Sequence, residues 1–185
     1  GKRECHVVSE RARPYPHPPM SPARAPHLPP RSGALHYWRL PRKDWEPALR
    51  GLLGLGFTAV ETYIPWSVHE VSAGQLDFGE LDRRKDVGAF LDLAHTLGLS
   101  AIVRPGPHIN AELTHFGIPE RVLLDPLCQA RSPRGNPVML YFPPRMFPVP
   151  SYASEAYLAE VGVWFDAVVQ QLASRVRPHG PVEWL

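Results

Sequence analysis

Short apolar runs alternate along the chain with stretches in which apolar residues recur at helical spacing. The apolar runs are rich in β-branched and aromatic side chains, which predicts strands at residues 34–38, 57–66, 99–103 and 181–185. Apolar positions three to four residues apart predict amphipathic helices at residues 45–53, 82–97 and 154–176. Strands that alternate with helices are typical of an α/β fold with a parallel sheet.

The alternation is interrupted once, between residues 104 and 153. A stretch of this length without a regular pattern is uncommon inside a compact domain, and it predicts a functional loop. The pattern also stops within the fourth strand, after three complete strand–helix units. A (β/α)8 barrel needs about 200 residues or more. We therefore expect residues 32–185 to be the amino-terminal half of a TIM barrel, truncated at the start of its fourth strand.

Composition separates the first 31 residues from the rest of the chain. Eight of the 23 prolines lie in the first 30 residues, and residues 1–31 carry a net charge of +4 within a total of +2. We expect a disordered Pro/Arg-rich leader at 1–31, because such a segment has too little apolar surface to fold. The remaining body is left with a charge of −2, which argues against a nucleic-acid partner.

Neither a membrane span nor a signal peptide is visible in the sequence, so we expect no membrane partner and favour a cytoplasmic location. The cysteines Cys5 and Cys128 form no disulfide framework and no zinc motif. Glycine patterns for nucleotide binding and the serine-hydrolase elbow are also missing from the sequence. We predict no metal and no cofactor.

Polar and aromatic residues follow the first three predicted strands. In parallel α/β folds, ligands bind at the carboxyl ends of the strands. A mixture of aromatic rings, histidines and carboxylates at that edge suits a polyhydroxylated ligand. The residues are His36, Tyr37, Trp38, Arg39, Tyr63, Trp66, His69, Glu70, Arg104, His108, Asn110, Glu112 and His115.

Several of these residues also have a structural interpretation. Trp38 and Trp66 favour packing over ligand contact, because tryptophan is usually buried. Glu61 lies within the second predicted strand. Two roles remain open for it: a structural ion pair with Arg104, or a part in the chemistry of the site. Each histidine taken singly is more often structural than catalytic.

Four sequence blocks in this order resemble the start of the catalytic barrel of glycoside hydrolase family 35, the β-galactosidases. They read SGALHYWRLPRKDW, ETYIPWSVHE, GQLDF and RPGPHINAE. The resemblance implies a glycosidase that hydrolyses terminal β-linked galactose, or a related β-glycoside, with retention. The family uses two glutamates, at the ends of its fourth and seventh strands. The resemblance therefore implies no catalytic residue in this chain, and places both glutamates beyond Leu185.

The resemblance does assign substrate-binding residues. Tyr63 matches the tyrosine of the family's TY-x-PW block, Ala111 and Glu112 match its Ala-Glu pair, and Ile109 and Asn110 line the same turn. The family commonly has cysteine and tryptophan where this chain has Asn110 and Leu113, which changes the pocket wall. The connection at residues 128–150 also looks longer than usual. Two alternatives remain open: a barrel hydrolase of another family, such as family 42, and a non-catalytic sugar-binding relative.

Overall fold

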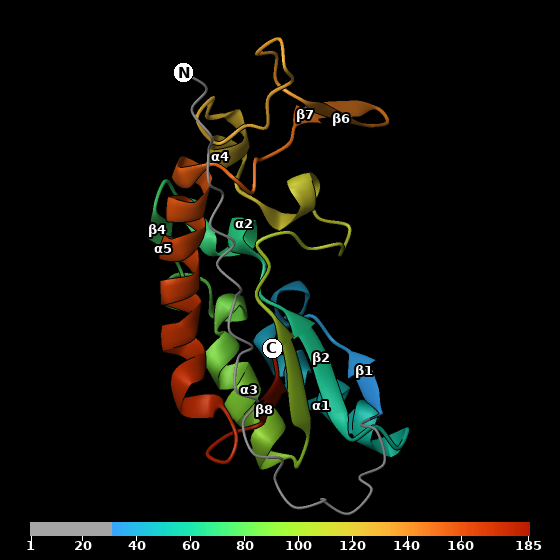
Figure 1. Ribbon diagram of the computed structural model, residues 1–185. Helices are drawn as coiled ribbons and strands as arrows, with labels where there is room; N and C mark the ends of the chain where they lie inside the picture. The colour runs from blue at the N-terminus through green and yellow to red at the C-terminus, as the bar shows by residue number, and fades with distance from the viewer. Residues whose placement is uncertain (1–30) are drawn as a thin grey trace, which may run out of the picture.

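A parallel sheet with helices on one side forms the framework of the protein, whose residues 31–185 are described by a computed structural model (Figure 1). Its strands are β1 (Ser32–Ala34), β2 (Ala59–Tyr63), β5 (Ser100–Arg104) and β8 (Val182–Trp184). They lie in the order β1-β2-β5-β8, and each neighbouring pair is parallel. The predicted α/β fold with a parallel sheet is confirmed. Each strand joins beside its predecessor, as in a barrel, whereas a doubly wound sheet reverses its order.

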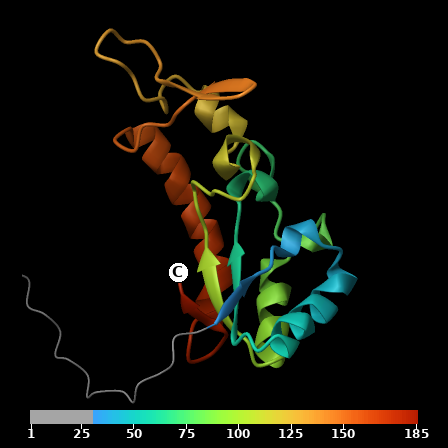
Figure 2. The same cartoon turned by 90° about the vertical axis from the view of Figure 1, so that its right-hand side faces the viewer.

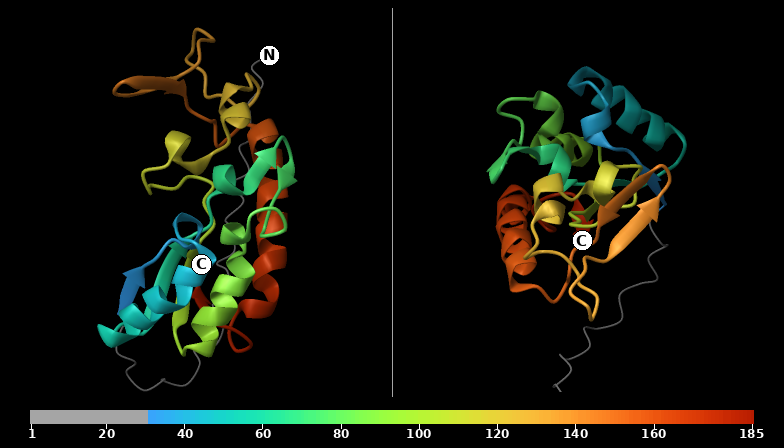
Figure 3. Two further views of the ribbon diagram at one scale, coloured as in Figure 1. Left: turned by 180° about the vertical axis from the view of Figure 1, so that it is seen from behind. Right: turned by 90° about the horizontal axis from the view of Figure 1, so that it is seen from above.

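Three helices connect consecutive strands and lie on one face of the sheet, as the view from behind shows (Figure 3). They are α1 (Trp45–Gly54), α3 (Val87–Thr96) and α5 (Glu155–Leu172), and α3 contacts both of the others. Two of them begin at side-chain caps. Asp86 accepts a hydrogen bond from the Ala89 N–H at 2.8 Å, and Ser154 accepts one from the Tyr157 N–H at 3.2 Å. The predicted helix at 82–97 therefore starts later than expected, at Val87.

Large aromatic side chains form much of the core between the sheet and these helices. Trp45, Trp66 and Trp164 are almost fully buried, and the last two stack with ring centroids 6.0 Å apart. The indole N–H of Trp45 donates to the Tyr37 carbonyl at 3.0 Å, so burial leaves that donor satisfied. Trp66 and Trp38 are only 2% and 8% exposed. The packing interpretation of both residues is confirmed.

The first strand is shorter than the apolar run, and the prediction of a strand over residues 34–38 is wrong. β1 ends at Ala34, and the 3-10 turn η1 (Tyr37–Arg39) follows it. Tyr37 and Trp38 are adjacent and both buried. Two consecutive buried side chains also occur within a strand, at Ala59 and Val60 of β2, so burial does not distinguish a turn from a strand here. Aromatic content alone had indicated the strand.

The long segment after β5 contains short regular elements, contrary to the prediction of an irregular loop. It holds η4 (Thr114–Gly117), α4 (Glu120–Leu124) and an antiparallel hairpin of β6 (Met139–Phe142) and β7 (Arg145–Pro148). Each is too short to produce a periodic pattern in the sequence. Figure 2 shows this segment beyond the carboxyl ends of β2 and β5. It therefore lies over the edge of the sheet where ligands of parallel α/β proteins bind.

The remaining elements are short connections. They are η2 (Arg42–Asp44), α2 (Trp66–His69), β3 (Glu70–Ser72), β4 (Gln75–Leu76), η3 (Arg83–Lys85) and η5 (Ala173–Arg175). No helix within residues 31–185 is long and apolar enough to cross a membrane. Residues 1–30 of the predicted leader lie outside the part of the chain that the structure describes.

Candidate functional site

Side chains at the ends of β2 and β5 form the first part of the candidate site. Tyr63 and Arg104 end these strands and are partners in the sheet register. The Arg104 guanidinium donates to the Tyr63 hydroxyl at 3.3 Å and lies 5.6 Å from the ring centroid. It also pairs with Glu61 at 3.1 Å. Glu61 is therefore an ion-pair partner, and through Arg104 it helps to hold the Tyr63 ring at the strand end.

Arg39, from η1, reaches the turn that follows β5. Its guanidinium donates to the Ala111 carbonyl, and its Nη1 lies 3.7 Å from a carboxylate oxygen of Glu112. Ala111 is buried, whereas the Glu112 side chain is 88% exposed. Arg39 thus fixes the backbone of the turn while leaving the neighbouring carboxylate open to a ligand.

The turn itself has an unusual backbone. Glu112, His115 and Phe116 have φ angles of 48°, 55° and 54°, in the left-handed region that disfavours side chains with a Cβ. Ile109 is buried, and its N–H donates to the Phe116 carbonyl at 2.7 Å, which closes the turn. Non-glycine residues persist in this conformation only where their surroundings hold them, and such positions concentrate at binding sites.

His36 lies between the two parts of the site. Its ring stacks on Trp38 with centroids 4.7 Å apart and lies 5.3 Å from the Tyr63 ring. Burial and the positive charge of Arg39 lower the pKa of His36 from its ordinary value. Its Nδ1 atom is buried and has no hydrogen-bond partner among the described residues. Both effects therefore disfavour the protonated form of the imidazole beside Tyr63.

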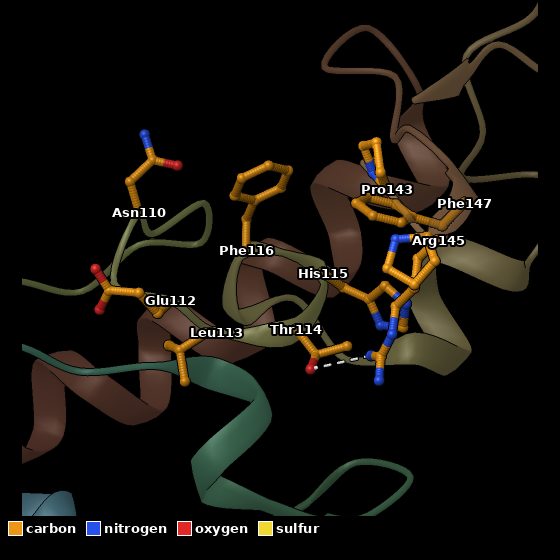
Figure 4. A pocket seen from close by; sticks show the side chains of 10 residues that line it. Asn110, Glu112, Leu113, Thr114, His115, Phe116, Pro143, Arg145 and Phe147 are labelled. Atoms are coloured by element: carbon orange, nitrogen blue, oxygen red, sulfur yellow. Dashed lines mark hydrogen bonds between the residues drawn. The ribbon is translucent and has the colours of Figure 1, made fainter. Parts of the chain in front are cut away.

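A pocket of about 510 Å³ opens next to this turn. One side is formed by residues 110 and 112–116, and the other by residues 143–145 and 147 of the β6–β7 hairpin. Figure 4 shows Asn110 and Glu112 at one end and the hairpin side chains at the other. Of the predicted binding residues, Asn110 and Glu112 line the pocket, whereas Tyr63, Ile109 and Ala111 are not part of its wall.

His69 belongs to the core and not to the site. The Tyr37 hydroxyl donates to its Nε2 at 2.6 Å, and its Nδ1–H donates to the Asp77 carbonyl at 2.8 Å. Burial lowers the pKa of His69 to about 4, although the bond to Asp77 opposes the shift. Its structural interpretation fits this geometry. His108 and His115 instead pack against Phe116 and Phe147.

Sequence reasoning placed Arg39 among the polar residues at the strand ends but gave it no contact with the turn after β5. It predicted a functional loop that includes the β6–β7 hairpin, but it named no hairpin residue as part of the site, because a pocket wall depends on how the segment folds back. Within residues 31–185, no group of three or more histidine, cysteine, aspartate or glutamate side chains is arranged to hold a metal ion.

Comparison with known proteins gives one consistent result. Residues 29–136 match the family model described as glycosyl hydrolases family 35. An exo-beta-D-glucosaminidase of Pyrococcus horikoshii is 40% identical over 140 residues, which cover 74% of this chain and 17% of the relative. Beta-galactosidase-1-like protein 3 of Mus musculus is 43% identical over 100 residues, 54% of this chain and 15% of the relative. A beta-galactosidase of Felis catus is 47% identical over 94 residues, 50% of this chain and 14% of the relative.

The chain spans less than a fifth of the length of these curated relatives. The family model nevertheless covers more than half of the chain. It includes the strands β1, β2 and β5 of the parallel sheet, together with the turn that carries Glu112. The resemblance drawn from the four sequence blocks is confirmed, and it excludes the family 42 alternative. The chain belongs to glycosyl hydrolases family 35.

Proposed function

We propose that residues 32–185 form the amino-terminal half of a (β/α)8 catalytic barrel in a retaining glycosidase of the β-galactosidase type. Membership of the family and the one-directional order of the four strands support this proposal. Barrel enzymes bind substrate at the carboxyl ends of their strands. Tyr63, Arg104 and the turn after β5 occupy that edge. The activity is that of the full-length protein.

The observation that carries the proposal is the exposed carboxylate of Glu112 beside Arg39. Arg39 fixes the adjacent Ala111 carbonyl and lies close enough to balance the charge of Glu112. A carboxylate held in this way accepts hydrogen bonds from neighbouring sugar hydroxyls. Tyr63 adds a ring face and a hydroxyl at the next strand, and Asn110 adds an amide at the pocket. We assign these residues, with Ile109 and Ala111 as the support of the turn, to the terminal sugar.

Glu112 is a binding residue in this proposal and does not transfer the proton. Retaining hydrolysis needs a carboxylate pair about 5 to 5.5 Å apart, one as nucleophile and the other as acid and then base. Among the described residues, the ion-pair partner of Glu112 is the guanidinium of Arg39, which suits a carboxylate that binds and positions a ligand. Glu183 in β8 is also engaged, by the Ser100 hydroxyl at 2.9 Å and by Arg177. We place the catalytic pair beyond Leu185.

Galactose is the preferred terminal sugar, and glucosamine is the second candidate. One matched relative carries the name of an exo-beta-D-glucosaminidase, and others carry that of a beta-galactosidase. An ammonium group on the sugar would be attracted by Glu112 but repelled by Arg39, 3.7 Å from that carboxylate. Sugar hydroxyls avoid the repulsion, so this geometry favours a neutral sugar.

The proposal is tested with the full-length protein and matched aryl glycosides. Initial rates on 4-nitrophenyl β-galactoside and 4-nitrophenyl β-glucosaminide give the sugar preference, and NMR of the first-formed anomer gives the stereochemistry. We expect hydrolysis of the galactoside with retention and a lower kcat/KM on the glucosaminide. Inversion of the anomeric centre contradicts the mechanism. Binding of galactose without turnover would instead favour the non-catalytic relative.

A further inference from the structure

The pocket next to Glu112 continues away from the proposed sugar site toward the β6–β7 hairpin (Figure 4). Glu112 stands at one end, and Arg145 and Phe147 of the hairpin stand at the other. If Glu112 holds the terminal sugar, the space beyond it receives the group to which that sugar is linked. The pocket thus lies where a glycosidase contacts the leaving group of its substrate.

The walls of this pocket are mainly apolar and partly aromatic. Leu113 and Phe116 contribute from the turn, and Pro143, Pro144 and Phe147 from the hairpin. Flat rings pack well against aromatic and proline surfaces. The other residues that line the pocket, Asn110, Glu112, Thr114, His115 and Arg145, are polar. The apolar part of the lining is suited to an aromatic leaving group, and the polar part to a charged or hydrogen-bonding substituent on that group.

The hairpin is held against the turn by ring contacts. Phe147 meets His115 edge-on with centroids 4.9 Å apart, and it meets Phe116 in the same manner at 6.0 Å. The left-handed backbone of His115 and Phe116 presents both rings to the hairpin. A wall fixed in this way is preorganised, so binding a ligand does not have to order it first.

Arg145 supplies a positive charge at the far end of the pocket. Its guanidinium makes one long hydrogen bond, 3.4 Å, to the Thr114 hydroxyl. Within residues 31–185 no carboxylate forms an ion pair with it, in contrast to Arg39 and Arg104, which both face glutamates. A guanidinium with unused donors beside an apolar wall is suited to a carboxylate on the ligand.

The hairpin also lies outside the part of the chain that matches the family. The family model ends at residue 136, and β6 begins at Met139. The turn that carries Glu112 lies within the residues matched by the family model, whereas the β6–β7 hairpin follows them.

We propose that this pocket binds the leaving group of the substrate and selects aromatic aglycones that carry a carboxylate. Phe116, Phe147 and the two prolines contact the ring, and Arg145 binds the carboxylate. The inference rests on the proposed function, because it assigns leaving-group binding to the half of the same site that faces away from the terminal sugar.

The test compares two substrates of the full-length protein, 4-carboxyphenyl β-galactoside and its methyl ester. The variants are Arg145→Gln and, as a matched control, Arg134→Gln. Arg134 is an exposed arginine of the same segment that does not line the pocket. For each substrate the variant is compared with the wild type, so the intrinsic reactivity of the leaving group cancels. We expect Arg145→Gln to lower kcat/KM about tenfold on the carboxylate and about twofold or less on the ester, because only the former loses a charge-assisted hydrogen bond.

A binding measurement separates this inference from the proposed function. Calorimetry with the 4-carboxyphenyl 1-thio-β-galactoside, which resists hydrolysis, should show a similar selective loss in Arg145→Gln. Equal losses on both substrates, or none on either, overturn the inference while leaving the glycosidase intact. Absence of turnover together with Arg145-dependent binding contradicts the proposed function and supports the inference. Failure of the wild type to bind the thioglycoside overturns the inference, whereas the proposed function is decided by hydrolysis of the 4-nitrophenyl glycosides.

Discussion

Replacing Glu112 with glutamine separates a binding role from a structural one. The side chain is 88% exposed, and its ion pair with Arg39 is long, at 3.7 Å. An exposed pair of this kind contributes at most about 1 kcal/mol to folding, so the stability of the variant should change little. A carboxylate that accepts hydrogen bonds from two sugar hydroxyls contributes more, because bonds to charged groups are the stronger ones. Its loss should cost about 2 to 4 kcal/mol in the transition state, or roughly thirty- to a thousandfold in kcat/KM.

The assay for Glu112→Gln uses an activated aryl β-galactoside and a β-linked disaccharide, each with and without azide. A binding residue is needed equally for both substrates, so we expect similar losses and no azide product. An acid/base residue behaves differently, because an activated leaving group departs without protonation and azide can attack the glycosyl-enzyme. Selective loss on the disaccharide with rescue by azide would show that the assigned role is wrong. Glu120→Gln, an exposed glutamate on α4, is the control for charge removal.

Three further predictions concern stability, each measured by urea unfolding. Glu112→Gly should stabilise the protein by up to about 1 kcal/mol, because glycine accepts a φ of 48° without strain, although sugar binding is lost. Tyr37→Phe should cost about 1 to 3 kcal/mol, since it leaves the buried Nε2 of His69 without its donor at 2.6 Å. The free energy of unfolding should fall by about 3 kcal/mol as pH drops from 6.5 to 4. In the folded protein the pKa of His69 is about 4, so the unfolded state takes up a proton at a higher pH than the folded state does. His69→Gln should flatten the curve in that window, and an unchanged slope would contradict this account.

The parts of the fold with long periodic patterns could be predicted from the sequence. The helices α1 and α5 lie where apolar spacing placed them, and β5 occupies the continuous apolar run that was assigned to the third strand. Such elements are specified locally, by residues close together in the chain. The β6–β7 hairpin could not be predicted in this way. Its strands are four residues each, and its position depends on contacts of Phe147 with His115 and Phe116, about thirty residues earlier.

The candidate site was predictable at the level of strand ends but not of individual contacts. Position after β5 identified Asn110 and Glu112, and both line the pocket. The ion pair of Glu112 with Arg39 could not be predicted from local sequence, because Arg39 lies more than seventy residues earlier in the chain. The ion pair of Glu61 with Arg104 was easier to anticipate, since neighbouring strands in register bring their ends together.

The turn η1 links the core to the site, and it is the element that aromatic content had indicated as strand. In a strand, residues 37 and 39 would point to the same face, because side chains alternate with a period of two. In a 3-10 turn, which has about three residues per turn, they point in different directions. Tyr37 can therefore be fully buried and donate to His69, while Arg39 reaches the Ala111 carbonyl. The buried Tyr37–His69 pair fixes η1, and η1 aims the Arg39 guanidinium that holds the turn after β5.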